Sequence, residues 1–244
     1  MGFHSHLPMS AYLPPPGNPR IKVVGSFAEL VATPFAGGFN ALCWPRTLPG
    51  DFREVVTALG AGEGIESLDE ERLQALTLSD AGRIARDILV ADLALLRAQA
   101  LAPELNCIHA YPRDDAAAAV PTDVYSFHAD SAPVEAATFL CTYHGAASEG
   151  LRNEDAQQRV AVPATRAELL REYGGADGAD FREFLSGNCY DLHYAPLPGA
   201  QPYSFGLGHL WRIAIDWPGS PVPPCVHRAP AQLPGEPPRL LLIS

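Results

Sequence analysis

Two histidines and one aspartate in the second half of the chain have the types and spacing of a metal site. His128 and Asp130 are one residue apart in the segment 127–130 (FHAD), and alternate side chains of a β-strand point to the same face. His227 is the third candidate ligand. Two imidazoles and one carboxylate, with the other coordination positions open, form the ligand set of non-haem Fe(II) oxygenases. We therefore predict that these three side chains meet at one metal ion.

Other residues compete for a place in this site. The rivals of His227 are His109, His144, His193 and His209. The strongest rival pair is Asp191 and His193, which also places a carboxylate and an imidazole on one strand face. A closed tetrahedral Zn(II) site would need a fourth protein ligand, such as Cys225 or His144. The residues leave both an open Fe(II) site and a closed Zn(II) site possible.

Arg239, twelve residues after His227, is the candidate for binding an anion. It begins the last apolar segment, 239–243 (RLLLI), so we expect its side chain to share a face with Leu241 and Ile243. A guanidinium buried without an anionic partner carries a large desolvation cost, and its planar fork matches a carboxylate. We expect a carboxylate ligand at Arg239.

The segments that carry these residues are expected to be short strands. Apolar or alternating runs bounded by Gly and Pro indicate strands at 107–111, 124–130, 136–143, 190–194, 210–217, 223–227 and 239–243. Two short helices, 166–173 and 180–185, interrupt them. Such a series of short strands is typical of a double-stranded β-helix, or jelly roll. We predict an α+β protein with a jelly-roll core at 105–244 that binds the metal.

The first half of the chain is expected to be a helical layer that packs on the sheet. An irregular arm, 1–20, precedes a helical scaffold at 21–104, and the whole forms one compact domain. The clearest helix is 79–101. Its apolar stripe consists of Ile84, Ile88, Ala91, Leu95 and Ala98, widened by Leu89, Leu93 and Leu96, and we expect Arg83, Arg86 and Arg97 to be solvated.

The composition excludes several classes of protein. There are 17 basic and 28 acidic residues, a net charge of −11, and no basic cluster, which argues against nucleic-acid binding. Five cysteines without a C-x-x-C pair indicate reduced thiols in a cytoplasmic protein. No signal peptide or apolar run long enough to span a membrane is visible. We expect a cytoplasmic protein with a small-molecule substrate and neither nucleic acid nor membrane as partner; the oligomeric state is left open.

The order H-x-D, a distant His, and an Arg about a dozen residues later resembles the Fe(II)/2-oxoglutarate-dependent dioxygenase superfamily. The resemblance implies Fe(II) bound by His128, Asp130 and His227, and 2-oxoglutarate bound by Arg239 as co-substrate. It implies an oxygenase of the hydroxylase type. The chain departs from the pattern at Leu241, where many such enzymes have a Ser or Thr that shares the co-substrate carboxylate. If the resemblance holds, the hydroxyl of Thr142 or Tyr143 is expected to take that role.

Residues 120–244 also resemble a bacterial family catalogued as a domain of unknown function. The similarity lies in 127–130 (FHAD), 140–145 (LCTYHG), 149–151 (EGL), and in 227–230 (HRAP) before 239–242 (RLLL), whereas 146–148 (AAS) departs from the usual Pro/Ala-Gly/Ala-Thr. It implies the jelly-roll core and the metal triad. A similarity to proteins that accompany zinc-related genes implies an alternative function, a non-catalytic metal-binding accessory protein that holds Zn(II) with the same His and Asp residues.

Overall fold

The structure is a computed structural model that describes residues 18–114, 118–231 and 235–244. The larger of its two sheets has seven strands in the order β1-β2-β11-β6-β13-β4-β3. Only β1 and β2 pair in parallel, so this sheet is mixed. Its strands are β1 (Ile21–Val23), β2 (Ala41–Trp44), β3 (Ile65–Leu68), β4 (Glu104–Ile108), β6 (Ala137–His144), β11 (Leu210–Ala214) and β13 (Arg239–Ile243).

The smaller sheet is antiparallel and has six short strands in the order β10-β7-β12-β5-β9-β8. Its strands are β5 (Phe127–His128), β7 (Glu149–Leu151), β8 (Ala156–Gln158), β9 (His193–Pro196), β10 (Tyr203–Ser204) and β12 (Val226–Arg228). The chain is therefore an α+β protein with a mixed seven-stranded sheet and an antiparallel six-stranded half-barrel sheet.

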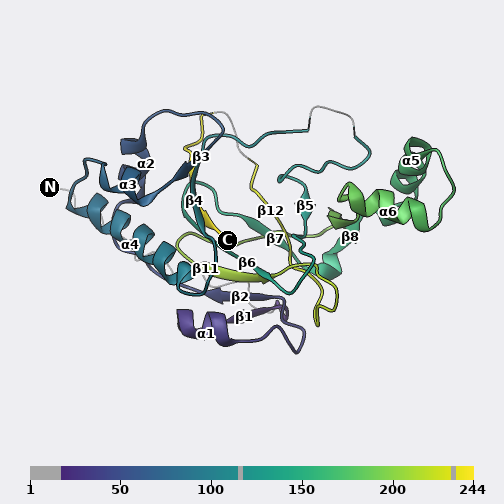
Figure 1. The fold of residues 1–244 in the computed structure, drawn as a ribbon, viewed down its shortest axis with the longest axis horizontal. Coiled ribbons are helices and arrows are strands. Elements are labelled where there is room, and N and C mark those ends of the chain that lie inside the picture. The colour runs from purple at the N-terminus through teal and green to yellow at the C-terminus, as the bar shows by residue number, and fades with distance from the viewer. Residues whose placement is uncertain (1–17, 115–117, 232–234) are drawn as a thin grey trace.

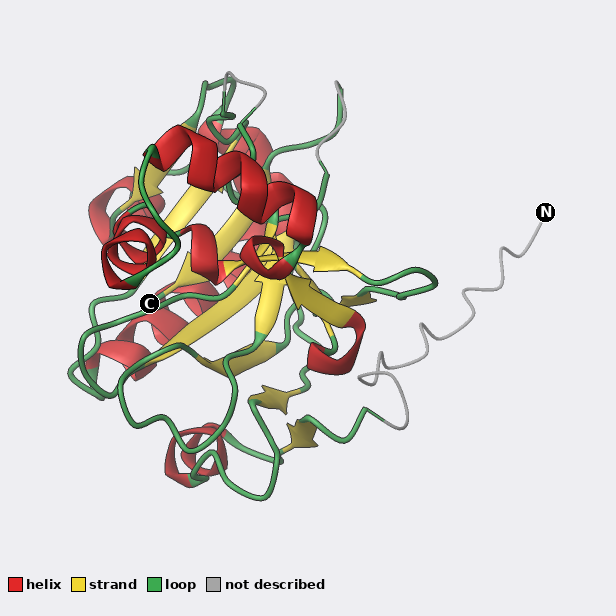
Figure 2. Ribbon diagram, turned by 90° about the vertical axis from the view of Figure 1, so that its right-hand side faces the viewer, coloured by secondary structure: helices red, strands yellow, loops and turns green. Residues whose placement is uncertain are grey.

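Helices from the first half of the chain cover one face of the seven-stranded sheet, whereas α5 and α6 lie at the opposite end of the molecule (Figures 1 and 2). The helices are α1 (Phe27–Ala32), α2 (Phe52–Leu59), α3 (Glu70–Gln74), α4 (Asp80–Arg97), α5 (Pro163–Tyr173) and α6 (Ala179–Gly187), with 3-10 turns η1 (Asn153–Asp155), η2 (Arg159–Ala161) and η3 (Tyr190–Leu192). Ser26 and Asp51 accept backbone N–H groups at the starts of α1 and α2, as their sequence predicts.

Alternation along the strands divides the core into two layers. On β13, Leu240 and Leu242 pack with the helices, while Leu241 belongs to the cluster on the other face. Arg239, Leu241 and Ile243 line the same cavity, which confirms that they share a face. The strands therefore direct one set of side chains to the helices and the other set to the space that contains the candidate ligands.

Two expectations for the first half of the chain were wrong. Residues 21–104 are not only helical, because β1, β2 and β3 come from this region and join the larger sheet. The buried residues of α4 are Gly82, Ala85, Leu89, Asp92, Leu93 and Leu96, while Ile84, Ala91 and Ala98 are exposed. The residues expected only to widen the stripe are thus its centre.

The arginines of α4 also differ from each other. Arg83 and Arg97 are exposed as expected, but the side chain of Arg86 is only 14% exposed. Most of the expected arm, residues 1–17, lies outside the described residues. Several strands are shorter than predicted; Tyr190–Leu192 is a 3-10 turn, and the strand there begins at His193.

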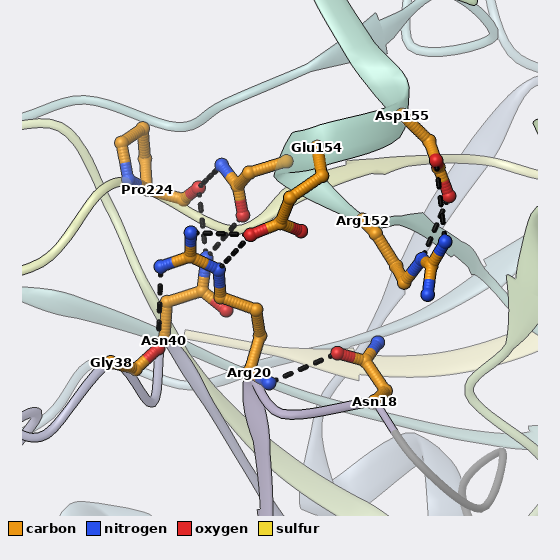
Figure 3. A network of polar contacts seen from close by, with 9 residues as sticks. Asn18, Arg20, Gly38, Asn40, Arg152, Glu154, Asp155 and Pro224 are labelled. Atoms are coloured by element: carbon orange, nitrogen blue, oxygen red, sulfur yellow. Dashed lines mark hydrogen bonds and ion pairs between the residues drawn. The ribbon is translucent and has the colours of Figure 1, made fainter.

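A polar network fastens the start of the chain to the turn after β7 (Figure 3). The guanidinium of Arg20 donates to the carboxylate of Glu154. The buried Asn40 donates from Nδ2 to Asn153 Oδ1 at 2.7 Å and to the carbonyl of Pro224 at 3.2 Å. These bonds join segments that flank strands of the two different sheets, so the network links the sheets through their connecting segments.

Candidate metal centre

Strand pairing in the smaller sheet brings the predicted ligands together. His128 of β5 lies directly opposite His227 of β12. Directly opposite residues of an antiparallel pair project on the same face of the sheet. Asp130 follows β5 by two residues, and its backbone carbonyl accepts the N–H of Asp216 at 2.8 Å. The pairing therefore unites residues that are about a hundred positions apart in the sequence.

The three side chains form a group that could hold one metal ion. One ligand atom from each of His128, Asp130 and His227 lies within 4.8 Å of the others. Nε2 of His128 is 3.8 Å from Asp130 Oδ1, and Nε2 of His227 is 3.7 Å from Asp130 Oδ2. The two imidazole rings are 4.6 Å apart between centroids. These spacings fit two imidazoles and one carboxylate around a shared ion.

Hydrogen bonds at the far side of each ligand fix its orientation. Nδ1 of His128 is 2.8 Å from the carbonyl of Ser126, and Nδ1 of His227 is 3.3 Å from the carbonyl of Cys225. A carbonyl can only accept, so each Nδ1 carries the proton and each Nε2 keeps its lone pair for the shared space. Thr138 Oγ1 donates to Asp130 Oδ2 at 2.5 Å. Each of the three candidate ligands thus has a hydrogen-bond partner that orients its side chain, as metal ligands usually do.

The protonation states also suit metal binding. Burial, followed by the neighbouring His227, lowers the pKa of His128 to about 4. Burial alone would raise the pKa of the Asp130 carboxyl, but His227, the Thr138 hydrogen bond and His128 together lower it below its ordinary value. At neutral pH His128 is neutral and Asp130 is ionised, which are the forms that bind a metal.

The rival ligands lie outside this group. Within the described parts of the chain, no fourth His, Cys, Asp or Glu joins the triad at ligand spacing. The Cys225 thiol is 3.9 Å from the Tyr203 hydroxyl, and burial raises its pKa to about 12. Nδ1 of His144 is 3.1 Å from the carbonyl of Pro238. Three protein ligands without a fourth leave coordination positions available for small molecules.

The remaining histidines and Asp191 are placed as follows. His193 is the nearest, with its ring centroid 5.7 Å from that of His128. His109 lies 3.8 Å from Glu66, and His209 Nδ1 accepts the backbone N–H of Arg46. Asp191 is in η3, and His193 begins β9, so the rival pair does not lie on one strand.

A cavity of about 240 Å³ adjoins the triad. His128, Asp130 and His227 line it together with Arg239. Its other walls are largely apolar, with Ile65, Ile108, Val124, Leu140, Ala229, Leu241 and Ile243 among the lining residues. A larger hollow of about 680 Å³ borders Arg53, Thr57 and His144, but none of the triad lines it. The smaller cavity therefore combines the metal-ligand group with a cationic group.

Arg239 is buried, with 1% of its surface exposed, yet it pairs with no carboxylate among the described residues. Its Nε donates to the carbonyl of Ala146 at 2.8 Å, and its terminal nitrogens donate to Tyr111 Oη at 2.5 Å and Ser148 Oγ at 2.9 Å. Burial lowers the pKa of Arg239, partly offset by Tyr111. Arginine nevertheless remains charged at neutral pH, so the cavity wall carries a positive charge that pairs directly with no carboxylate of the described residues.

The two hydroxyl candidates lie on opposite faces of β6. Thr142 Oγ1 accepts a long hydrogen bond of 3.4 Å from Arg239. Tyr143 faces the helices, where its hydroxyl donates to Asp92 at 2.6 Å. Sequence reasoning missed Ser148 and Tyr111, the closer hydroxyl partners of Arg239. A hydroxyl two residues after Arg239 would lie on β13 itself. Ser148 instead reaches the guanidinium from the loop between β6 and β7, in the segment 146–148.

None of the described helices is both long and apolar enough to cross a membrane. The comparisons with known proteins add no family: no protein-family model, no curated protein and no solved structure shows significant similarity to this chain.

Proposed function

We propose that this protein is a non-haem Fe(II)- and 2-oxoglutarate-dependent oxygenase of the hydroxylase type, built on a jelly-roll core. In this proposal His128, Asp130 and His227 bind Fe(II), and Arg239 binds the distal carboxylate of 2-oxoglutarate. The observation that carries it is a single cavity with the three-ligand group and a buried arginine that has no carboxylate partner among the described residues.

The chain's own groups would position the reactants. The guanidinium of Arg239 supplies a charge-assisted contact for a carboxylate, and Ser148 and Thr142 add hydroxyls beside it. Asp130 and the two Nε2 atoms offer three ligands, so a metal held by them would keep positions for ligands that the protein does not supply. The apolar part of the cavity wall would limit the access of water to these positions.

The bound metal and co-substrate would supply the oxidative chemistry. With both bound, they would use one O₂ per turnover: one oxygen atom would end in succinate as 2-oxoglutarate loses CO₂, and the other would end in a hydroxyl group on a substrate carbon. The protein contributes placement and a dry pocket.

A second candidate function uses the same ligands. A non-catalytic accessory protein would hold Zn(II) with His128, Asp130 and His227. A closed structural site needs a fourth protein ligand, and the described residues offer none at ligand spacing. Such a site would also leave the buried guanidinium of Arg239 without a carboxylate partner among the described residues. We therefore favour the oxygenase.

The test is succinate formation by the Fe(II)-loaded protein supplied with 2-oxoglutarate and O₂. The assay follows 2-oxoglutarate turnover that is uncoupled from a primary substrate, so it needs no knowledge of that substrate. We expect succinate from the wild type and none from Asp130→Ala, which removes a ligand. Equal background from both proteins, at full iron loading of the wild type, would reject the oxygenase.

A further inference from the structure

The cavity contains one more polar group that the metal and co-substrate sites do not use. Asn106 of β4 lines the cavity beside the triad and Arg239 and is only 7% exposed. It lies opposite Leu241 of β13 on one side and opposite Ser67 of β3 on the other. The strand pairing therefore holds its amide in a fixed place on the inner face of the larger sheet.

The Asn106 amide makes no side-chain hydrogen bond within residues 18–114, 118–231 and 235–244. A carboxamide offers two donors and an acceptor, and those of Asn106 can bond with water or with a ligand in the cavity that it lines. The other hydroxyls of this region already have partners: Thr142, Ser148 and Tyr111 all contact Arg239. Asn106 is therefore the group in the cavity wall that is left to meet a ligand.

The position of Asn106 favours the primary substrate over 2-oxoglutarate. Asn106 is level with Leu241, about 7 Å along the sheet from Arg239, and one strand, about 4.8 Å, to the side of β13. This displacement is towards β3 at the edge of the sheet, where Ile65 is 49% exposed. Val124, 36% exposed, also borders the cavity. The amide thus lines the same cavity as the triad but is displaced from Arg239, both along the sheet and towards its β3 edge.

The charges of the lining limit the substrate further. Arg228, the other charged residue that lines the cavity besides Asp130 and Arg239, is paired with Glu149 at 2.7 Å. No free charge is then left for the primary substrate in the described lining once Asp130 binds the metal and Arg239 binds the co-substrate. A neutral hydrogen-bonding group next to an aliphatic group fits such a wall.

We propose that Asn106 recognises the primary substrate, a neutral molecule whose carboxamide-like group pairs with the Asn106 amide while an adjacent aliphatic group faces the triad. A donor beside an acceptor on the substrate matches the donor and acceptor of asparagine in two parallel hydrogen bonds. As a statement about the substrate of an oxygenase this rests on the proposed function, but the binding of the amide to Asn106 does not require turnover.

The probe is 3-methylbutanamide, with 3-methylbutanoate and N,N-dimethyl-3-methylbutanamide as matched compounds that lack the neutral donor–acceptor pair. Binding is measured by ligand-observed NMR on full-length protein loaded with redox-inert Zn(II) and 2-oxoglutarate. We expect the amide to bind at millimolar concentration and both analogues to bind at least tenfold more weakly. Asn106→Leu should weaken the amide at least tenfold and change the 2-oxoglutarate affinity less than threefold, while Ser67→Ala, the neighbour on β3, should change neither.

Unchanged affinity for the amide in Asn106→Leu would overturn this assignment, and so would equal affinities of the wild type for the amide and its two analogues. An equal loss of affinity for 2-oxoglutarate in Asn106→Leu would also overturn it, because Asn106 would then belong to the co-substrate site. Thermal unfolding of the variant confirms that it is folded. If the wild type binds the amide through Asn106 but never binds 2-oxoglutarate, the oxygenase proposal fails and the amide site stands. The two proposals can thus fail separately.

Discussion

Replacing Arg239 by leucine removes the group on which the co-substrate assignment depends. The side chain is buried, and its fork meets Ala146, Tyr111 and Ser148 while pairing with no carboxylate in the described chain. The variant loses these hydrogen bonds but also removes a buried charge, so we expect it to fold. The candidate metal ligands lie on or next to strands of the other sheet, and none of them is among the hydrogen-bond partners of Arg239.

The size of the effect follows from the lost contact. A hydrogen bond to a charged group contributes about 1.5–3 kcal/mol. This corresponds to a loss of 2-oxoglutarate affinity of roughly 10- to 150-fold. Arg239→Lys keeps a point charge but loses the planar fork, so we expect an intermediate loss. Metal affinity should stay within about threefold of the wild type in both variants, because no metal ligand changes.

Isothermal titration calorimetry on the Zn(II)-loaded protein measures both affinities without turnover. Matched titrations of succinate, which lacks the 2-oxo group, report on the carboxylate contact alone. If Arg239→Leu binds 2-oxoglutarate within threefold of the wild type, the guanidinium does not hold the co-substrate. If the variant loses the metal as well, Arg239 supports the site as a whole and the reasoning about a separate anion site is wrong.

Three further changes test the fold and the site. Leu93→Ala on the buried face of α4 should lower the free energy of unfolding by about 2–5 kcal/mol, whereas Ile84→Ala on its exposed face should change it by less than about 0.5 kcal/mol. Equal losses in a denaturant titration would contradict the assignment of Leu93 to the buried face. Asn40→Ala removes both hydrogen bonds from Asn40 to the turn and to Pro224 and should cost about 1–3 kcal/mol in the same assay; a change below about 0.3 kcal/mol would show that the network does not hold the sheets. The pKa of His128 falls from 6.5 to about 4 on folding, so the unfolded chain binds more protons than the folded protein between these pH values. The free energy of unfolding of the metal-free protein should therefore decrease by up to about 3 kcal/mol as the pH falls from 6.5 to 4. His128→Gln should remove this pH dependence, and a free energy of unfolding that does not change with pH in the wild type would contradict the prediction.

The sequence predicted the site better than the fold around it. The alternation of FHAD is local, so the segment by itself is enough to place His128 and Asp130 on one face. His227 could be chosen only by its order in the chain, because the pairing of β12 with β5 is a long-range contact. The face of Arg239 again followed from alternation within its own strand.

The misses have a common physical cause. β1, β2 and β3 are short and gain their stability from pairing with other strands of the sheet. The helix-capping residues and helical periodicity of the surrounding sequence therefore led to a prediction of helices alone in this region. The predicted apolar stripe of α4 is shifted by one residue from the face that is buried in the structure. The helix has apolar residues on more than one face, so only packing against the sheet decides which face is buried. Ser148 and Tyr111 reach Arg239 from segments that sequence spacing does not connect.

The most direct measurement of the central claim is an anaerobic Fe(II) titration followed by visible and X-ray absorption spectroscopy, with and without 2-oxoglutarate. We predict one iron per chain, two imidazole ligands, and a new visible charge-transfer band when 2-oxoglutarate is added, because the described residues leave open positions at the metal. His227→Ala should abolish the band. A tetrahedral site closed by a fourth protein ligand, with no spectral response to 2-oxoglutarate, would contradict the oxygenase and support a zinc-binding role.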